Sequence, residues 1–365
     1  MMPITEHYCR EISQRDYRGK RLACWMHITS SAPPMLLALA ESGAEIAIGA
    51  CNVDSTNDAV AAYLSERRIT VYGWRGMVRE DYDQNMQLVR AFDADYLCDM
   101  GGELSLAYRD REPPVRGGLE ATTSGLNVLR DHEIPFPVFD WNSIPLKDGL
   151  ENRFHVGNEI WPVFSEVTWM SLFRRSVLVV GYGPVGKGIA ERARDLGAIV
   201  YVVDRDAVRL ITAQHHGCIP VSLEEGLARC QIVVTATGVK GVLGEHYLRQ
   251  AQPGTIFLNA GHSNREIDVD WLYRQPYQRM KAHVERFDLN ATHIFLLAKG
   301  SLLNLAAGTG AGADLFDLYT AVMLRGISWL FDGGAEGAPP GVQPYPSELE
   351  QEIARLSVKL HAEVS

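Results

Sequence analysis

One segment of this 365-residue chain reads Val177-Leu178-Val179-Val180-Gly181-Tyr182-Gly183-Pro184-Val185-Gly186-Lys187-Gly188. Four apolar residues lead directly into the pattern Gly-x-Gly-x-x-Gly. Residues 189–197 have the spacing of an amphipathic helix that ends at a glycine. A second apolar run, 199–203, follows and ends at Asp204. This order of strand, glycine turn, helix, strand and acid predicts a dinucleotide-binding unit rather than a plain structural turn.

Each glycine of this segment has a physical role in such a unit. Gly181 permits the tight turn, and Gly183 lets backbone amides approach a pyrophosphate. Gly186 lets the helix pack close to the strand. The helix N-terminus, where Pro184 and Val185 lie, offers its unpaired N–H groups to the phosphates. These residues form the core of the predicted cofactor site.

Asp204 indicates which dinucleotide is bound. A carboxylate at this position accepts hydrogen bonds from both ribose hydroxyls and repels a 2′-phosphate, which favours NAD. Arg205 and Arg209 follow closely and are included in the predicted site. Their positive charge would favour NADP, the alternative cofactor.

The composition excludes several classes of function. A length of 365 residues suits two domains. The formal net charge of −10 gives no basis for binding nucleic acid or an anionic membrane. The six cysteines are scattered without a Cys-x-x-Cys pair, which predicts reduced thiols and no metal site. Because neither a signal peptide nor a long uncharged apolar run is present, we expect a cytoplasmic protein.

The first part of the chain alternates between strand and helix patterns. Strands are predicted at 21–25, 45–49, 70–72, 95–98 and 137–141, with 116–124 as a loop. This alternation predicts a parallel sheet with helices on both faces. Ligands of such sheets bind at the carboxyl ends of the strands. The polar residues just past those ends form the predicted substrate lining: His27, Thr29, Asn52, Ser55, Asp99 and Glu103.

The second part contains the remaining strands of a nucleotide-binding fold, at 177–180, 199–203, 232–235, 255–259 and 293–298. The fold class is therefore α/β, with two doubly wound parallel-sheet domains, one of which is a Rossmann NAD-binding domain. We expect a substrate or catalytic domain at 1–155, completed by 312–340. The Rossmann domain is expected at 156–311, and a C-terminal helix at 341–365.

Several further motifs accompany the glycine segment. They read His27-Ile28-Thr29, Gly101-Gly102, Thr122-Thr123-Ser124-Gly125, Asn259-Ala260-Gly261-His262, Glu266-Ile267-Asp268-Val269-Asp270-Trp271 and Leu297-Ala298-Lys299-Gly300. Together they make the chain resemble the S-adenosyl-L-homocysteine hydrolase family over nearly its whole length. The resemblance implies that tightly held NAD⁺ oxidises a ribose 3′-hydroxyl. The ketone acidifies the 4′ C–H, the 5′ substituent is eliminated, water adds, and NADH reduces the ketone.

The resemblance also implies roles for individual residues. Lys147 would be the base that assists hydride removal, with Asn152 beside the same hydroxyl and Glu151 where the family has aspartate. His27 matches the histidine that transfers a proton on the 5′ side. Further positions match the family's cofactor pocket: Thr122, Thr123, Ser124, Asn142, Asp204, Thr237, Gly261, His262 and Asn304. Their neighbours Ala236, Gly238 and Ala260 are included in the predicted cofactor site. His262 is also expected to contact substrate.

Plain structural alternatives exist for these residues. His27 would then be a satisfied histidine at a strand end, and Lys147 a solvated loop lysine. Glu151 would be an acid at a helix start, and Asp99 and Glu103 would cap helices.

The departures from the family pattern concern the substrate. Met100, a predicted substrate contact, stands where the family carries an active-site aspartate, and Ala121 where it carries a glutamate that contacts ribose. Ser31 and Ala311 replace the residues that read adenine. The family's C-terminal tail, which reaches a neighbouring subunit's cofactor, is missing. The redox residues are thus retained, whereas recognition of adenine and ribose is rewritten.

Three functions follow from this combination. The first is a divergent NAD-dependent enzyme that acts on a nucleoside-like small molecule, in one version a nucleoside dehydratase that stops at the alkene. The second is a true adenosylhomocysteinase with a compensated pocket. The third is a catalytically idle NAD-binding regulatory homologue. In each case we expect a homo-oligomer, either a dimer or a tetramer.

Overall fold

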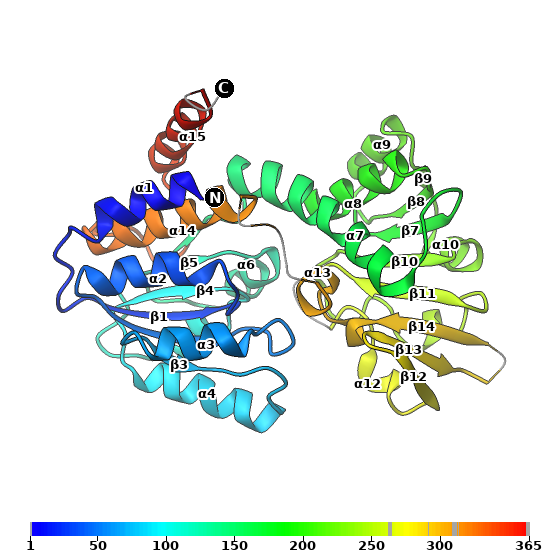
Figure 1. Ribbon diagram of the computed structural model, residues 1–365, viewed down its shortest axis with the longest axis horizontal. Helices are drawn as coiled ribbons and strands as arrows, with labels where there is room; N and C mark the ends of the chain where they lie inside the picture. The colour runs from blue at the N-terminus through cyan, green and yellow to red at the C-terminus, as the bar shows by residue number, and fades with distance from the viewer. Residues whose placement is uncertain (1, 262–264, 291, 309–311, 313, 363–365) are drawn as a thin grey trace. The chain divides into compact units, whose positions relative to one another are not determined.

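The computed structural model describes residues 2–261, 265–290, 292–308, 312 and 314–362. The chain forms two compact units (Figure 1). Unit 1 comprises residues 1–147 and 312–365, and unit 2 comprises residues 148–311. The expected substrate domain therefore ends at 147 and not at 155, because the segment after Lys147 packs with the nucleotide-binding unit.

Unit 1 is built on a parallel sheet in the order β15-β6-β5-β4-β1-β2-β3. The predicted strands are confirmed, but the predicted loop 116–124 contains a strand that its glycine-rich sequence does not indicate. The bounds are β1 (Arg21–Met26), β2 (Glu45–Ala50), β3 (Thr70–Tyr72), β4 (Tyr96–Asp99), β5 (Gly117–Glu120), β6 (Pro137–Asp140) and β15 (Gly341–Pro344).

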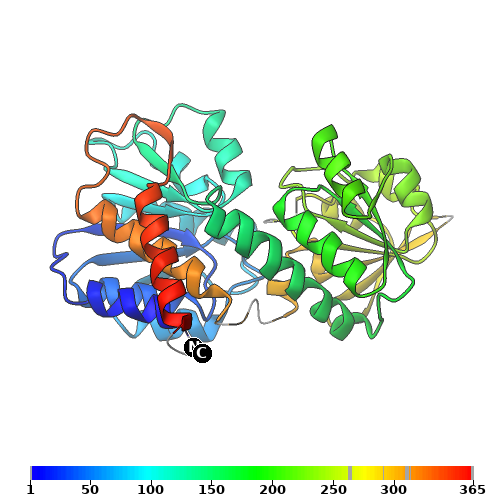
Figure 2. The ribbon, with the colours of Figure 1, turned by 90° about the horizontal axis from the view of Figure 1, so that it is seen from above.

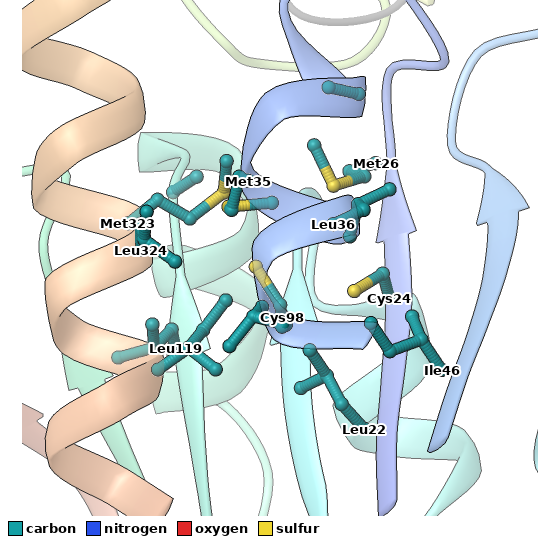
Figure 3. Packing of buried hydrophobic residues seen from close by; sticks show 14 of the residues in the cluster. Leu22, Cys24, Met26, Met35, Leu36, Ile46, Cys98, Leu119, Met323 and Leu324 are labelled. Carbon is teal, nitrogen blue, oxygen red and sulfur yellow. The ribbon is translucent and has the colours of Figure 1, made fainter. Parts of the chain in front are cut away.

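Helices cover both faces of this sheet (Figure 1). Successive side chains of a strand point to opposite faces, so Leu22, Cys24 and Met26 of β1 enter one core and Ala23 and Trp25 the other. Figure 3 shows the first core, where β1 meets α2 and α14. The helices are α1 (Pro3–Ile12), α2 (Ala32–Glu41), α3 (Asp58–Ser65), α4 (Arg79–Ala91), α5 (Glu103–Ala107), α6 (Thr123–Arg130), α14 (Phe316–Phe331) and α15 (Ser347–Ala362).

The C-terminal part of the chain completes unit 1. Asp317 of α14 accepts hydrogen bonds from the backbone N–H groups of Ile4 at 2.9 Å and Thr5 at 2.6 Å, which ties the start of α14 to α1. The sequence predicts a separate C-terminal helix at 341–365, but in the structure this part of the chain belongs to unit 1. It adds the edge strand β15 beside β6, and α15 packs on α14 through Leu349 and Ile353 (Figure 2).

Unit 2 contains a sheet in the order β12-β13-β14-β11-β10-β7-β8-β9. The strands predicted from the sequence are confirmed and parallel, whereas the antiparallel hairpin β12–β13 and the short β9 are additional. The largely exposed β12 has no apolar alternation to reveal it. The bounds are β7 (Ser176–Val180), β8 (Ile199–Val203), β9 (Ile219–Pro220), β10 (Ile232–Thr235), β11 (Thr255–Asn259), β12 (Tyr277–Lys281), β13 (Val284–Asp288) and β14 (His293–Leu297).

The connecting helix α7 lies tightly against α8. A Cβ added to Gly157 of α7 would lie 2.5 Å from the carbonyl carbon of Gly188 in α8, so only glycine fits there. Trp161 donates from Nε1 to the Ile189 carbonyl at 3.0 Å. The helices of unit 2 are α7 (Val156–Thr168), α8 (Pro184–Asp195), α9 (Ala207–His215), α10 (Leu223–Arg229), α11 (Glu245–Leu248), α12 (Val269–Leu272) and α13 (Leu303–Ala306), with the π-helix η1 (Pro145–His155) before them and the 3₁₀ turn η2 (Ala298–Gly300) before α13.

The described ranges contain neither a membrane-spanning helix nor a cluster of metal ligands. None of their helices combines the length and the apolar character that crossing a membrane requires. They also contain no group of three or more His, Cys, Asp or Glu residues arranged to hold a metal ion.

Candidate functional site

The glycine turn of unit 2 has the geometry that its sequence predicts. Gly181 adopts a φ of +97°, and a Cβ there would lie 2.6 Å from the Ala236 carbonyl oxygen. A Cβ on Gly186 would lie 1.8 Å from the carbonyl oxygen of Gly181. A Cβ on Gly183, the N-cap of α8, would meet a single atom within 4 Å among the described residues, Arg209 Nη1 at 3.7 Å. The turn is therefore packed on its protein side and open at the N-terminus of α8, which fits a pyrophosphate.

Asp204 lies at the end of β8 with its side chain 8% exposed. Its Oδ2 accepts from Tyr182 N at 2.6 Å and its Oδ1 from Asp206 N at 2.9 Å. A carboxylate has about four acceptor positions, so Asp204 can hold the glycine turn and also accept from ribose hydroxyls.

The nearby arginines are balanced by acids or point to solvent. Arg209 lies 3.6 Å from Asp204 and 3.7 Å from Asp206, so its charge is already shared with two carboxylates. Arg205 is exposed. This pairing supports NAD over NADP, because a 2′-phosphate would have to enter beside two acids.

Glu266 organises the loop after β10, a role that sequence reasoning missed although it lies in a quoted motif. The side chain is 2% exposed, and burial raises its pKa. Oε2 accepts from the backbone N–H of Thr237 at 2.9 Å and from its Oγ1 at 2.7 Å, and Oε1 accepts from Gly238 N at 2.8 Å. Glu266 thereby fixes Ala236, Thr237 and Gly238, which are predicted to contact the cofactor.

Asn259 ties the ends of neighbouring strands together. Its Oδ1 accepts from Thr235 Oγ1 at 3.0 Å and from Gly261 N at 2.7 Å, and its Nδ2 donates to the Gly300 carbonyl at 3.0 Å. Ala260 between them is buried. Two predicted residues of this region, His262 and Ala311, lie outside the described residues.

Asn304 supplies an acceptor that fits a ligand. It is 4% exposed, and its Oδ1 has no hydrogen-bond partner among the described residues. Buried acceptors in proteins are nearly always satisfied. The carboxamide NH₂ of a nicotinamide is a donor of the required kind. With the glycine turn and Asp204, this residue set fits NAD.

His27, Asn52 and Ser55 of unit 1 are brought together as predicted. His27 Nδ1 lies 2.7 Å from Ser55 Oγ. Ser55 Oγ in turn donates to the Asn52 carbonyl at 3.1 Å, and Asn52 Oδ1 accepts from Ser55 N at 3.1 Å. These bonds fix the imidazole at the carboxyl end of β1. Thr29 and Ser31 form a separate hydroxyl pair, with 3.0 Å between Oγ1 and Oγ.

Asp99 is completely buried and caps a helix. Its Oδ2 accepts from Ser105 N of α5 at 2.7 Å, while Oδ1 has no partner among the described residues. Burial, with a smaller repulsion from Glu103, raises its pKa to about 7. Glu103 itself accepts a hydrogen bond from the Tyr82 hydroxyl. Both acids thus match the helix-cap and packing alternative more closely than a substrate lining.

Glu120 is a second buried acid that sequence reasoning missed. It accepts from Gly101 N at 3.1 Å, from Gly102 N at 3.0 Å, and from both N and Oγ1 of Thr122. Burial and the nearby Asp99 raise its pKa well above the usual range. Glu120 therefore joins the loop that carries Met100 to the loop that begins at Ala121.

Thr122, Thr123, Ser124 and Asn142 meet at the ends of β5 and β6. Thr122 caps α6, with Oγ1 accepting from Gly125 N at 2.9 Å and from Ser124 Oγ at 3.2 Å. Asn142 donates from Nδ2 to Thr123 Oγ1 at 3.0 Å. The structure thus groups these predicted cofactor contacts within unit 1.

Lys147 is not a solvated loop residue. It lies in the π-helix η1 and is 7% exposed, with Nζ 4.9 Å from the ring centroid of Tyr319. Tyr319 donates from its hydroxyl to Met100 Sδ at 3.6 Å. Tyr319 was missed from the sequence because it lies on α14, far from Lys147 along the chain.

Glu151 and Asn152 lie further along the same helix. Both are buried, at 7% and 8% exposed. Asn152 donates from Nδ2 to Asp148 Oδ1 at 3.2 Å. Their burial fits a fixed polar arrangement more closely than an exposed helix start.

The comparisons with known proteins cover both units. The family model described as S-adenosyl-L-homocysteine hydrolase matches residues 1–122, and that of its NAD binding domain matches residues 164–310. An S-inosyl-L-homocysteine hydrolase of Methanopyrus kandleri is 32% identical, over 95% of this chain and 84% of the relative. An adenosylhomocysteinase of Pyrococcus abyssi is 31% identical, over 98% of this chain and 87% of the relative.

Proposed function

Because this chain belongs to the NAD-dependent S-adenosyl-L-homocysteine hydrolase family, we propose that it transiently oxidises a 3′-type sugar hydroxyl of a nucleoside-like substrate. Elimination or addition at the adjacent 4′ and 5′ carbons would follow, and then reduction. NAD⁺ held by unit 2 supplies the hydride acceptor and later returns the hydride. The buried Lys147, at the family's base position, is the observation that carries this proposal.

The side chains of unit 1 would move the protons. Lys147 Nζ would accept the proton of the hydroxyl that becomes a ketone, which requires the neutral amine. His27 would transfer a proton at the 5′ side, because Ser55 at 2.7 Å fixes the orientation of its ring. A base and an acid on separate, fixed supports suit the abstraction of a C–H proton next to a carbonyl.

The apolar residues Met100 and Ala121 support a substrate other than S-adenosylhomocysteine. Met100 is 3% exposed and cannot ionise, and Ala121, also 3% exposed, has no polar side-chain atom. A sugar hydroxyl that is buried beside these two side chains without a hydrogen-bond partner costs about 1–3 kcal/mol of binding free energy. We therefore propose a substrate that differs from S-adenosylhomocysteine near Met100, and a nucleoside dehydratase that stops at the alkene is one version.

Full hydrolysis of a nucleoside thioether is the second candidate. The relatives are named for two nucleosides, adenosine in Pyrococcus abyssi and inosine in Methanopyrus kandleri. This variety favours a family whose thioether chemistry stays constant while the base changes. The retained His27 supports this candidate too, because water addition at the 5′ carbon needs a proton transfer.

The test is to mix the NAD-loaded protein with a panel of nucleosides and their S-homocysteine conjugates. Reduction of the bound cofactor is followed by its absorbance, and products are identified by mass. Released homocysteine would establish hydrolysis, and loss of water from a nucleoside would establish dehydration. If no compound reduced the cofactor, the proposal would fail and the idle regulatory homologue would be favoured.

A further inference from the structure

We propose that Tyr319 is a substrate-recognition residue whose hydroxyl binds the sugar hydroxyl next to the one that Lys147 deprotonates, the 2′-hydroxyl of a ribonucleoside. This inference rests on the proposed function and names a residue and a substrate group that it leaves open. Tyr319 would supply the polar contact to the sugar that the side chains of Met100 and Ala121 cannot supply.

Tyr319 contacts three side chains: Met100, Lys147 and Trp141. Its hydroxyl lies 3.6 Å from Met100 Sδ, and its ring centroid lies 4.9 Å from Lys147 Nζ. Its ring also lies 4.9 Å from the ring of Trp141, which is completely buried. One side chain therefore contacts both the candidate base and the residue that replaces the family's acid.

The position of Tyr319 is fixed by the fold. Phe316 packs edge-on against its ring, with 5.5 Å between centroids. Two residues before Tyr319, Asp317 binds the backbone N–H groups of Ile4 and Thr5. Because α14 is pinned at this end, the phenol is presented by a rigid element, as accurate recognition requires.

The chemistry of the hydroxyl suits a sugar. A phenol can both donate and accept, whereas a thioether sulfur is only a weak acceptor. A substrate hydroxyl would therefore bind the phenol more strongly than the Met100 sulfur does. Since Lys147 lies over the same ring, a sugar with one hydroxyl at Nζ would carry its neighbouring hydroxyl towards the phenol.

The experiment is a double-mutant cycle between protein and substrate. The Tyr319→Phe variant keeps the ring and removes the hydroxyl. It is compared with the wild type on ribonucleosides and on their 2′-deoxy counterparts. Single-turnover reduction of the bound NAD and calorimetric affinity are measured. The Tyr17→Phe variant is the matched control, because Tyr17 bonds through its hydroxyl to Ser328 at the far end of the same helix.

We expect Tyr319→Phe to weaken affinity for ribonucleosides by roughly 3- to 10-fold, the scale of one neutral hydrogen bond, and to leave 2′-deoxynucleosides unaffected. Equal losses on both substrates, or no loss on either, would overturn the inference. Tyr319→Leu also removes the ring that lies beside Lys147, so its reduction rate should fall with both substrates.

The two proposals can fail separately. If the wild type reduces its cofactor but Tyr319→Phe is indistinguishable from it, only the inference is wrong. If no nucleoside reduces the cofactor, the proposed reaction is wrong. The calorimetric cycle still decides the hydroxyl contact, because binding does not depend on turnover.

Discussion

Glu350 of the C-terminal helix accepts a hydrogen bond at 2.9 Å from the backbone N–H of Leu146, 204 residues earlier in the chain. The carboxylate is 8% exposed, so the bond is largely shielded from water. Leu146 directly precedes Lys147. The last helix of unit 1 therefore fixes the segment that carries the candidate base.

Replacement of Glu350 by alanine should slow reduction of the bound cofactor without releasing it. The Leu146 N–H would lose its partner, at a cost of about 1–3 kcal/mol in unfolding free energy, and the Lys147 segment would lose its support. Glu350→Gln keeps an acceptor oxygen and should retain most activity. Exposed Glu348→Ala is the control. Denaturant unfolding and single-turnover reduction measure the two effects, and equal rates for Glu350→Ala and wild type would refute this role.

Lys147→Ala should retain NAD but lose hydride transfer by roughly 100-fold or more, the scale for removal of a general base. NAD content is measured after extraction, and reduction by single-turnover absorbance. Lys20→Ala is a suitable control, since this lysine also lies over an aromatic ring, that of Tyr96. Unchanged reduction in Lys147→Ala would remove this residue from the mechanism.

Asp204→Ala should lose its cofactor. The carboxylate supplies the expected ribose contact and also holds Tyr182 N, so the weakening should be about 10- to 100-fold, as for hydrogen bonds to a charged group. The dissociation constant for NAD is measured on the apo protein. Arg209→Ala serves as a comparison, and it should not convert the protein to NADP binding if Asp204 sets the preference. An Asp204→Ala protein purified with full NAD would contradict this assignment.

Sequence reasoning predicted the parts of the fold that depend on local pattern. The strand ending at Val180 and the turn at Gly181 were predicted because apolar runs and glycines are local signals. The strand Gly117–Glu120 was missed, because its two glycines indicate a loop although its residues are fully buried between neighbours. The return of residues 341–362 to unit 1 depends on long-range pairing of Gly341–Pro344 with β6, which no local pattern encodes.

The same limit applies to the candidate site. His27 and Ser55 were predicted together because both follow adjacent parallel strands. Tyr319 could not be assigned, because only the packing of α14 brings it to Lys147. The assignment of Asp99 as a substrate contact stays a prediction, because a strand-end acid and a helix cap have the same sequence signature. Its burial and its bond to Ser105 N favour the cap.

The buried Asp99 should make the protein less stable as the pH rises. Its folded-state pKa is about 7, against an ordinary value of 3.8. Between these values the folded state binds more protons than the unfolded state, so the free energy of unfolding falls with rising pH. The titratable groups that face Asp99 are Glu103, Glu120, Cys51 and Cys98. Asp99→Asn keeps an acceptor for Ser105 N and removes this titration.

The measurement is urea unfolding of wild type and Asp99→Asn at several pH values from about 4 to about 7, the window that the two pKa values define. We expect the difference in unfolding free energy to shift in favour of the variant as the pH rises. Glu103 and Glu120 stay in both proteins. Because Asp99 raises the pKa of Glu120, replacement of Asp99 by asparagine also weakens the titration of Glu120, which shifts the difference in the same direction. A difference that does not change with pH would show that Asp99 is already ionised in the folded protein at the low end of the window.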